Sequence, residues 1–287
     1  MEISSLSFFV FYLKKRVNKV MTDIKFEPKA TKYSSNNAYL LAQAARLAYQ
    51  PSESVENTIK NEWKMPNVRF IDRQETQCFV AGDDEKIIIS FRGTEPKKIQ
   101  DLMSDIKLKL VAHPLGKVHR GFLAAIDYAW DDVLKTLQEF HTNNQTVWFT
   151  GHSLGAALAT LGVAKMYDIN QPVHGLYTFG QPRTGDSKFA EKFDLKYKSC
   201  SFRFVNNNDI VTRVAPSALG YKHIGTFLYI DADKILHHDI RWWNQFKDRI
   251  KGSIEDLGKP GLDSIKDHDM GLYLKGIEKN LDKNPIA

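Results

Sequence analysis

The sequence has few cysteines and no long hydrophobic run. Its 287 residues contain two cysteines, Cys78 and Cys200, and neither has the spacing of a metal-ligand pair. Both lie in strand-like runs, where buried free thiols are common, and the sequence leaves a disulfide between them open. The longest early apolar run, residues 6–13, is far shorter than the roughly 18 residues that span a bilayer. We therefore expect a soluble globular protein with no metal site and no transmembrane segment.

The sequence also lacks a recognisable signal peptide. The basic residues Lys14, Lys15 and Arg16 follow the first apolar run instead of preceding it, which is the reverse of a secretory signal. We expect residues 1–20 to be a leader or a dispensable segment, and the protein to be cytoplasmic or exported by a non-classical route. No repeat, low-complexity tract or linker divides the rest. Residues 21–287 are therefore predicted to form a single domain.

No cluster of basic residues stands out, although the formal net charge is +6. Lysines and arginines are scattered among acidic residues, and no arginine-rich or aromatic-interleaved patch occurs. Such patches are typical of nucleic-acid modules. The sequence therefore argues against a nucleic-acid partner.

Strands and helices alternate along most of the chain, as the apolar patterns indicate. Helices are predicted over residues 38–49, 122–140, 154–167 and 187–193, with two more near the C-terminus, one of them beginning at His237 and His238. The strand-like runs are VRFID, TQCFVAG, KIIISFRG, VWFT, HGLYTFG, SFRFVN and GTFLYID. This order predicts an α/β fold in which antiparallel strands lead into a mostly parallel sheet with helices on both faces.

The stretch GHSLG places Ser153 between Gly151 and Gly155, after a buried strand and before a helix rich in small residues. A sharp strand-to-helix turn of this kind exposes a serine hydroxyl for nucleophilic attack, and the two glycines avoid crowding in the turn. The alternative is that Ser153 only caps the helix. The context favours the nucleophile.

An acid and a histidine should follow the serine in that order. Asp209 lies just after the strand SFRFVN, at a carboxyl end where α/β sheets place their sites, although an Asp there could also cap a turn. Four histidines lie downstream of Asp209: His223, His237, His238 and His268. His268 is favoured because it precedes an apolar helix and can lie over the sheet edge.

Six motifs together resemble the lipase class 3 family, the fungal-lipase-like triacylglycerol hydrolases, over roughly residues 35–280. They are FRGTEP, VHRGFLAA, GHSLGAALATL, TFGQPRTGD, FRFVNNNDIVTRVAP and DHDMGLYL. The resemblance implies an α/β-hydrolase fold with a short helical lid. It also implies that Ser153 is the nucleophile, Asp209 the acid and His268 the base.

The resemblance implies two further features of the site. Thr94, through its N–H and hydroxyl, and the N–H of Leu154 correspond to the oxyanion hole, which stabilises the negative oxygen of the intermediate. The segment EPKKIQDLMSDIKLKL corresponds to the lid, a helix that moves aside at a lipid surface. Its apolar stripe has helical spacing, and a core-packing helix would show the same stripe. The stripe consists of Ile99, Leu102, Met103 and Ile106.

These features predict a serine carboxylester hydrolase of acylglycerols and related fatty-acyl esters, acting at a lipid–water interface without a cofactor. A phospholipase A1 or a galactolipase is the alternative within the same chemistry. A catalytically silent α/β-hydrolase used as a binding module is an alternative from another class, and it would be expected to have lost part of the triad. The oligomeric state does not follow from the sequence.

Overall fold

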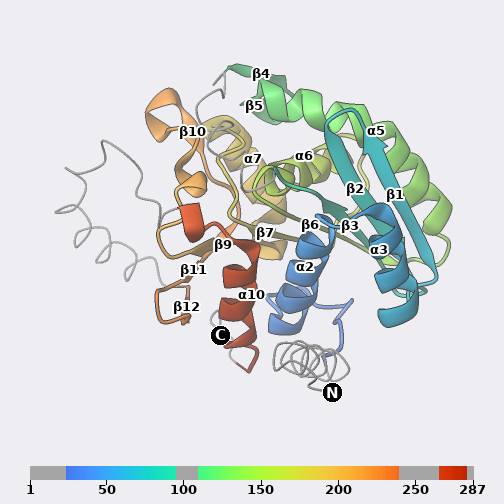
Figure 1. The fold of residues 1–287 in the computed structure, drawn as a ribbon. Helices are drawn as coiled ribbons and strands as arrows, with labels where there is room; N and C mark the ends of the chain where they lie inside the picture. The colour runs from blue at the N-terminus through green and yellow to red at the C-terminus, as the bar shows by residue number, and fades with distance from the viewer. Residues whose placement is uncertain (1–23, 95–108, 239–264, 283–287) are drawn as a thin grey trace.

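The protein is described by a computed structural model that covers residues 24–94, 109–238 and 265–282, and an eight-stranded sheet runs through its centre (Figure 1). The strand order is β1-β2-β3-β6-β7-β9-β11-β12. The five strands from β3 to β11 pair in parallel, and β1, β2 and β12 are antiparallel to their neighbours. The strands are β1 (Asn67–Arg73), β2 (Thr76–Gly82), β3 (Lys86–Phe91), β6 (Thr146–His152), β7 (Gly175–Phe179), β9 (Ser201–Asn206), β11 (Thr226–Ile230) and β12 (Leu236–His237).

Helices cover both faces of this sheet and enclose two hydrophobic cores (Figure 1). One face is covered by α5 (Arg120–Phe140), α6 (Leu154–Asp168) and α7 (Ser187–Tyr197), and the other by α2 (Ser35–Leu47), α3 (Ser52–Asn57) and α10 (Met270–Glu278). Neighbouring side chains of β3 enter opposite cores, Ile87 and Ile89 on the α6 side and Ile88 on the α2 side. The predicted burial of this strand on both faces is confirmed.

Short elements complete the described fold. A second sheet of four strands, in the order β10-β8-β5-β4, packs against α7. It was not predicted, because strands of two to four residues are too short to show a periodic pattern. Its strands are β4 (Leu110–His113), β5 (Gly116–His119), β8 (Gly185–Asp186) and β10 (Tyr221–Lys222), and the chain also forms a π-helix at Thr58–Glu62 and 3-10 helices at Lys198–Cys200, Val211–Arg213 and Ser217–Leu219.

The predicted start of one helix at His237 is wrong. His237 lies in the edge strand β12, opposite Tyr229 of β11, and not at the start of a helix. The turn between these strands is fixed by Asp231, whose carboxylate accepts hydrogen bonds from the backbone N–H of Ile235 and from the His237 ring. The rest of the predicted helix falls on residues from 239 onward, which lie outside the described part of the chain. Both cysteines are free thiols; Cys78 lies in β2, as expected, but Cys200 ends a 3-10 helix.

Two predictions concern residues outside the described part of the chain: the N-terminal segment 1–20 and the lid residues Ile99, Leu102, Met103 and Ile106. The single domain over residues 21–287 stays a prediction. Within the described ranges, none of the helices combines the length and apolar character of a membrane span.

Gly175→Ala should destabilise the centre of the sheet. Gly175 in β7 lies opposite Trp148 in β6, and an added Cβ would lie 2.2 Å from the buried indole ring. We expect the free energy of unfolding, measured by urea denaturation, to fall by about 1–3 kcal/mol through overpacking. Gly82→Ala in β2 is the control, because its Cβ would lie 3.3 Å or more from any neighbour. Equal losses in both variants would contradict this account.

Candidate active site

The turn between β6 and α6 holds Ser153 in a rare backbone conformation. Its φ is 59° and its ψ is −127°, a region that costs of order 1–3 kcal/mol and clusters at functional sites. An added Cβ on Gly151 would lie 2.3 Å from the carbonyl oxygen of Gly155, and one on Gly155 would lie 2.2 Å from that of Phe91. The predicted reason for both glycines is confirmed: side chains there would force α6 away from the sheet.

The Ser153 side chain does not cap α6. Its backbone N–H is held by the carbonyl of Phe179 at the end of β7, at 2.9 Å. The hydroxyl is fully buried and has no hydrogen-bond partner within the described residues. Buried polar atoms in native proteins nearly always have a hydrogen-bond partner. The unpartnered hydroxyl of Ser153 therefore needs an explanation, and helix capping does not provide one.

Asp209 lies in the loop that follows β9, as predicted, and is buried. Its Oδ1 accepts the backbone N–H of Val211 at 2.9 Å, which is the turn-capping role considered above. Its Oδ2 lies 2.7 Å from Nδ1 of His268. The carboxylate therefore fixes its own loop with one oxygen and the histidine ring with the other.

His268 is the histidine that the fold brings to Asp209. It precedes α10, it is 1% exposed, and its Nε2 is buried without a partner in the described structure. With Nδ1–H donating to the carboxylate, Nε2 carries the free lone pair of a neutral imidazole. Of the alternatives, His223 lies between β10 and β11, while His237 pairs with Asp231 at 2.7 Å and His238 follows it.

Tyr273 contacts the same carboxylate oxygen and was not predicted. Its hydroxyl, on α10, donates to Oδ2 of Asp209 at 2.5 Å. Burial, and then the charge of Asp209, raise the pKa of the phenol well above its ordinary value, so it stays a donor. In the sequence this tyrosine is one more aromatic residue on an apolar helix, which indicates core packing and not a site.

Gly180 makes room for the acid and the histidine, and it was also missed. It follows β7 with a φ of +60°, and an added Cβ would lie 2.7 Å from Cε1 of His268 and 2.9 Å from Oδ2 of Asp209. Within TFGQPRTGD it is one of two glycines, and the sequence does not distinguish their roles.

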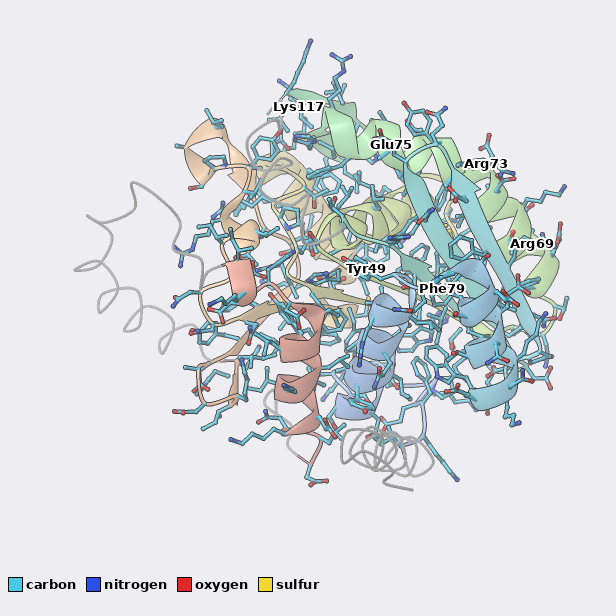
Figure 2. The ribbon with its side chains drawn as sticks, viewed as in Figure 1. Tyr49, Arg69, Arg73, Glu75, Phe79 and Lys117 are labelled. Atoms are coloured by element: carbon cyan, nitrogen blue, oxygen red, sulfur yellow. The ribbon has the colours of Figure 1, made fainter. Side chains whose placement is uncertain are left out.

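Two further residues were not predicted: His152, which contacts His268, and Tyr49, which contacts His152. The Tyr49 hydroxyl lies 2.8 Å from Nδ1 of His152, and Nε2 of His152 lies 2.8 Å from the carbonyl oxygen of His268. The two imidazole rings face one another with their centres 4.4 Å apart. Figure 2 shows Tyr49 beyond the end of α2, near the middle of the molecule.

Leu154 directly follows Ser153, and Thr94 follows Gly93, which lies close to the serine. Leu154 is the first residue of α6, where backbone N–H groups are free of intrahelical partners. Thr94 is half-buried after the end of β3. Its neighbour Gly93 packs so closely that an added Cβ would lie 3.1 Å from Cβ of Ser153. That Thr94 and Leu154 form an oxyanion hole stays a prediction.

A cavity of about 730 Å³ opens beside the histidine. This volume lies within the range typical of ligand pockets. The wall is formed by the end of α2, by His152 and by the segment that leads into α10. The lining residues are Arg46, Tyr49, Gln50, His152, Ile265, Lys266, His268, Asp269, Met270, Gly271 and Leu272.

Metal ligation has no evident place in the described ranges. No group of three or more His, Cys, Asp or Glu side chains gathers there in a way that could hold a metal ion. That the protein works without a cofactor stays a prediction.

A parallel sheet with helices on both faces, and a Ser-Asp-His set at its carboxyl edge, define the class of α/β hydrolases. Solved structures agree: lipase II of Rhizopus niveus matches with a TM-score of 0.58 and 27% identity, over 68% of this chain and 79% of its own. A structure described as a triacylglycerol lipase with a serine protease triad as its catalytic centre matches with a TM-score of 0.54 and 27% identity, over 67% and 77%. The predicted fold class is confirmed.

Sequence comparison identifies the family. The model of lipase (class 3) matches residues 88–218, and the triacylglycerol lipase OBL1 of Arabidopsis thaliana is 32% identical over 253 residues, covering 67% of this chain and 49% of that protein. The chain belongs to the lipase class 3 family, as its motifs indicated. It spans about half the length of the curated relatives that it matches.

The burial of His152 should make stability depend on pH. Burial, together with the nearby His268, lowers the pKa of His152 well below its ordinary value. The unfolded chain takes up a proton at this residue below about pH 6.5, and the native state does not. Stability should therefore fall as the pH drops through 6.5, by up to roughly 1.4 kcal/mol per pH unit for this group.

His152→Gln should flatten that dependence between pH 7 and pH 5, as measured by urea denaturation at each pH. Tyr33→Phe is a suitable control, because it removes a buried hydroxyl without a hydrogen-bond partner and leaves every histidine in place. It should keep the wild-type slope. An unchanged slope in His152→Gln would show that His152 is not the buried neutral group described here.

Proposed function

We propose that this chain is a serine carboxylester hydrolase that cleaves acylglycerols and related fatty-acyl esters at a lipid–water interface. The observation that carries the proposal is the 2.7 Å contact between Asp209 and Nδ1 of His268, together with two buried atoms that have no partner among the described residues, Oγ of Ser153 and Nε2 of His268. A nucleophile and a base need these two atoms free to react with a substrate and with one another.

In the proposed reaction Ser153 attacks the ester carbonyl while Nε2 of His268 accepts the hydroxyl proton. Asp209 holds the Nδ1–H and stabilises the imidazolium. The backbone N–H groups of Thr94 and Leu154 bind the negative oxygen of the tetrahedral intermediate. When the intermediate collapses, the C–O bond to the alcohol breaks and His268 protonates the leaving oxygen. Water then attacks the acyl-enzyme by the same route and releases the fatty acid.

The relatives support lipid esters as the substrate class. Those matched include a triacylglycerol lipase of Arabidopsis thaliana and a structure whose centre is described as a serine protease triad. A silent binding module is disfavoured, because such a module would be expected to have lost part of the triad. This chain retains Ser153, Asp209 and His268, and Asp209 contacts His268.

Ser153→Ala should abolish hydrolysis of p-nitrophenyl butyrate and of emulsified long-chain triacylglycerol. We expect kcat to fall by about 10⁵-fold, because loss of the nucleophile removes the covalent route. A fluorophosphonate probe, followed by mass analysis of peptides, should label Ser153 in the wild type. Ser201→Ala is the matched control, since Ser201 is also a buried serine and lies at the start of β9, at the other end of the strand from Asp209.

A wild type that turns over neither ester and takes no label would overturn the proposal. Turnover that survives in Ser153→Ala would overturn the assignment of the nucleophile. Phosphatidylcholine and galactolipid vesicles, tested in parallel, separate the phospholipase and galactolipase alternatives. Turnover of these vesicles without turnover of triacylglycerol would replace the substrate named here.

A further inference from the structure

Tyr49 and His152 make a continuous set of contacts beside the triad that the reaction above does not use. The carbonyl of His268 can only accept a hydrogen bond, so Nε2 of His152 must carry the proton of that 2.8 Å contact. A neutral imidazole then has a bare Nδ1, to which the Tyr49 hydroxyl donates at 2.8 Å. The partners thus fix the His152 tautomer, and burial keeps the ring neutral by lowering its pKa.

The Tyr49 hydroxyl also contacts Gly93, the residue before Thr94. An added Cβ on Gly93 would lie 2.3 Å from this hydroxyl and 2.3 Å from the carbonyl oxygen of His152. Burial raises the pKa of the Tyr49 phenol, and the charge of Arg92 and a backbone hydrogen bond from Gly93 act in the opposite direction. One phenol oxygen thus contacts both His152 and the residue before Thr94.

The segment that carries His268 is held at two successive carbonyl groups. Asn206, in the acid's strand β9, donates from Nδ2 to the carbonyl of Asp267 at 2.7 Å. His152, in the nucleophile's strand β6, donates to the carbonyl of His268. Without His152 this segment would keep its anchor on the acid's side and lose the one on the nucleophile's side. The ring of His268 would then be free to tilt away from Ser153.

We propose that Tyr49 and His152 form a positioning pair that fixes the base His268 relative to the nucleophile and to the oxyanion segment at Gly93 and Thr94. The pair acts through His268 and Gly93 and does not react with substrate. This inference rests on the proposed function, because it assigns the contacts a role in ester cleavage.

The neutral state of His152 is part of this role. The two rings face one another at 4.4 Å, and His268 becomes positively charged when it accepts the serine proton. A second positive charge at that distance would oppose the proton transfer. A buried, uncharged imidazole supplies the donor to the His268 carbonyl without this repulsion.

The test compares Tyr49→Phe, His152→Gln and His152→Leu with the control Tyr33→Phe. Tyr49→Phe should lower kcat for p-nitrophenyl butyrate by about 10- to 100-fold, the effect expected of a small displacement of catalytic groups, with little change in KM. The rate of fluorophosphonate labelling should fall in proportion. His152→Gln should retain more activity than His152→Leu, because its amide can still donate to the carbonyl of His268.

A nitrogen NMR measurement tests the contacts independently of turnover. In the wild type, the nitrogen signals of His152 should show a protonated Nε2 and an unprotonated Nδ1. These signals are assigned to His152 because they should be absent from the spectrum of His152→Gln. Tyr49→Phe should shift the Nδ1 signal, because it removes the hydrogen bond to that atom. Tyr33→Phe should change neither the signal nor kcat, and its unfolding midpoint gives the effect of losing a buried hydroxyl.

Two outcomes would overturn the positioning role. One is that Tyr49→Phe keeps the wild-type kcat, and the other is that Tyr33→Phe lowers kcat as much as Tyr49→Phe does. A His152 with protonated Nδ1 in the wild type would overturn the contacts themselves. Failure of the proposed function would give a different result. The wild type would then neither hydrolyse the ester nor react with the probe, while the NMR signals would still report the contacts of His152.

Discussion

The turn at Ser153 is the constraint on which the other parts of the site depend. Its positive φ lets the chain reverse from β6 into α6 within one residue, and it requires α6 to pack directly on the sheet. Gly155 then contacts the end of β3 at Phe91, and the Ser153 N–H reaches the end of β7 at Phe179. The segments after these two strand ends carry Thr94 and Gly180. One backbone conformation thus sets where the segment with Thr94 begins, which we propose to be the oxyanion segment, and where space for the His268 ring is left.

Asp209 and His268, the acid and the base of the proposed reaction, come from segments 59 residues apart, and their burial determines how they interact. In a site shielded from water, an unpaired carboxylate would be costly, so Asp209 is stable only with several donors around it. It has three: the ring of His268, the hydroxyl of Tyr273 and the backbone of Val211. Tyr273 and His268 share one oxygen, which makes α10 a second support for the acid. The helix after the base thus stabilises the acid as well.

The sequence predicted the elements with strong patterns and the residues with reactive side chains. The triple-isoleucine strand, the helix of small residues after Ser153 and the loop position of Asp209 all followed from local pattern. The short strands of the second sheet did not, and His237 lies in an edge hairpin and not at the predicted start of a helix. Tyr49, His152, Gly180 and Tyr273 were missed for a different reason. Each acts by contact with a residue far away in the chain, and composition and spacing carry no record of such contacts.

Some polar groups of the site have hydrogen-bond partners on every side, and others have none. Asp209 has donors on both oxygens, and His152 has a partner on each ring nitrogen. Such complete networks rigidify a buried region, whereas a single unmade hydrogen bond costs about 1–3 kcal/mol. Within this group of described residues the unpartnered atoms are Oγ of Ser153 and Nε2 of His268. The surrounding network thus satisfies the groups that position Ser153 and His268, and it leaves free the two atoms to which the proposed reaction assigns the nucleophile and the base.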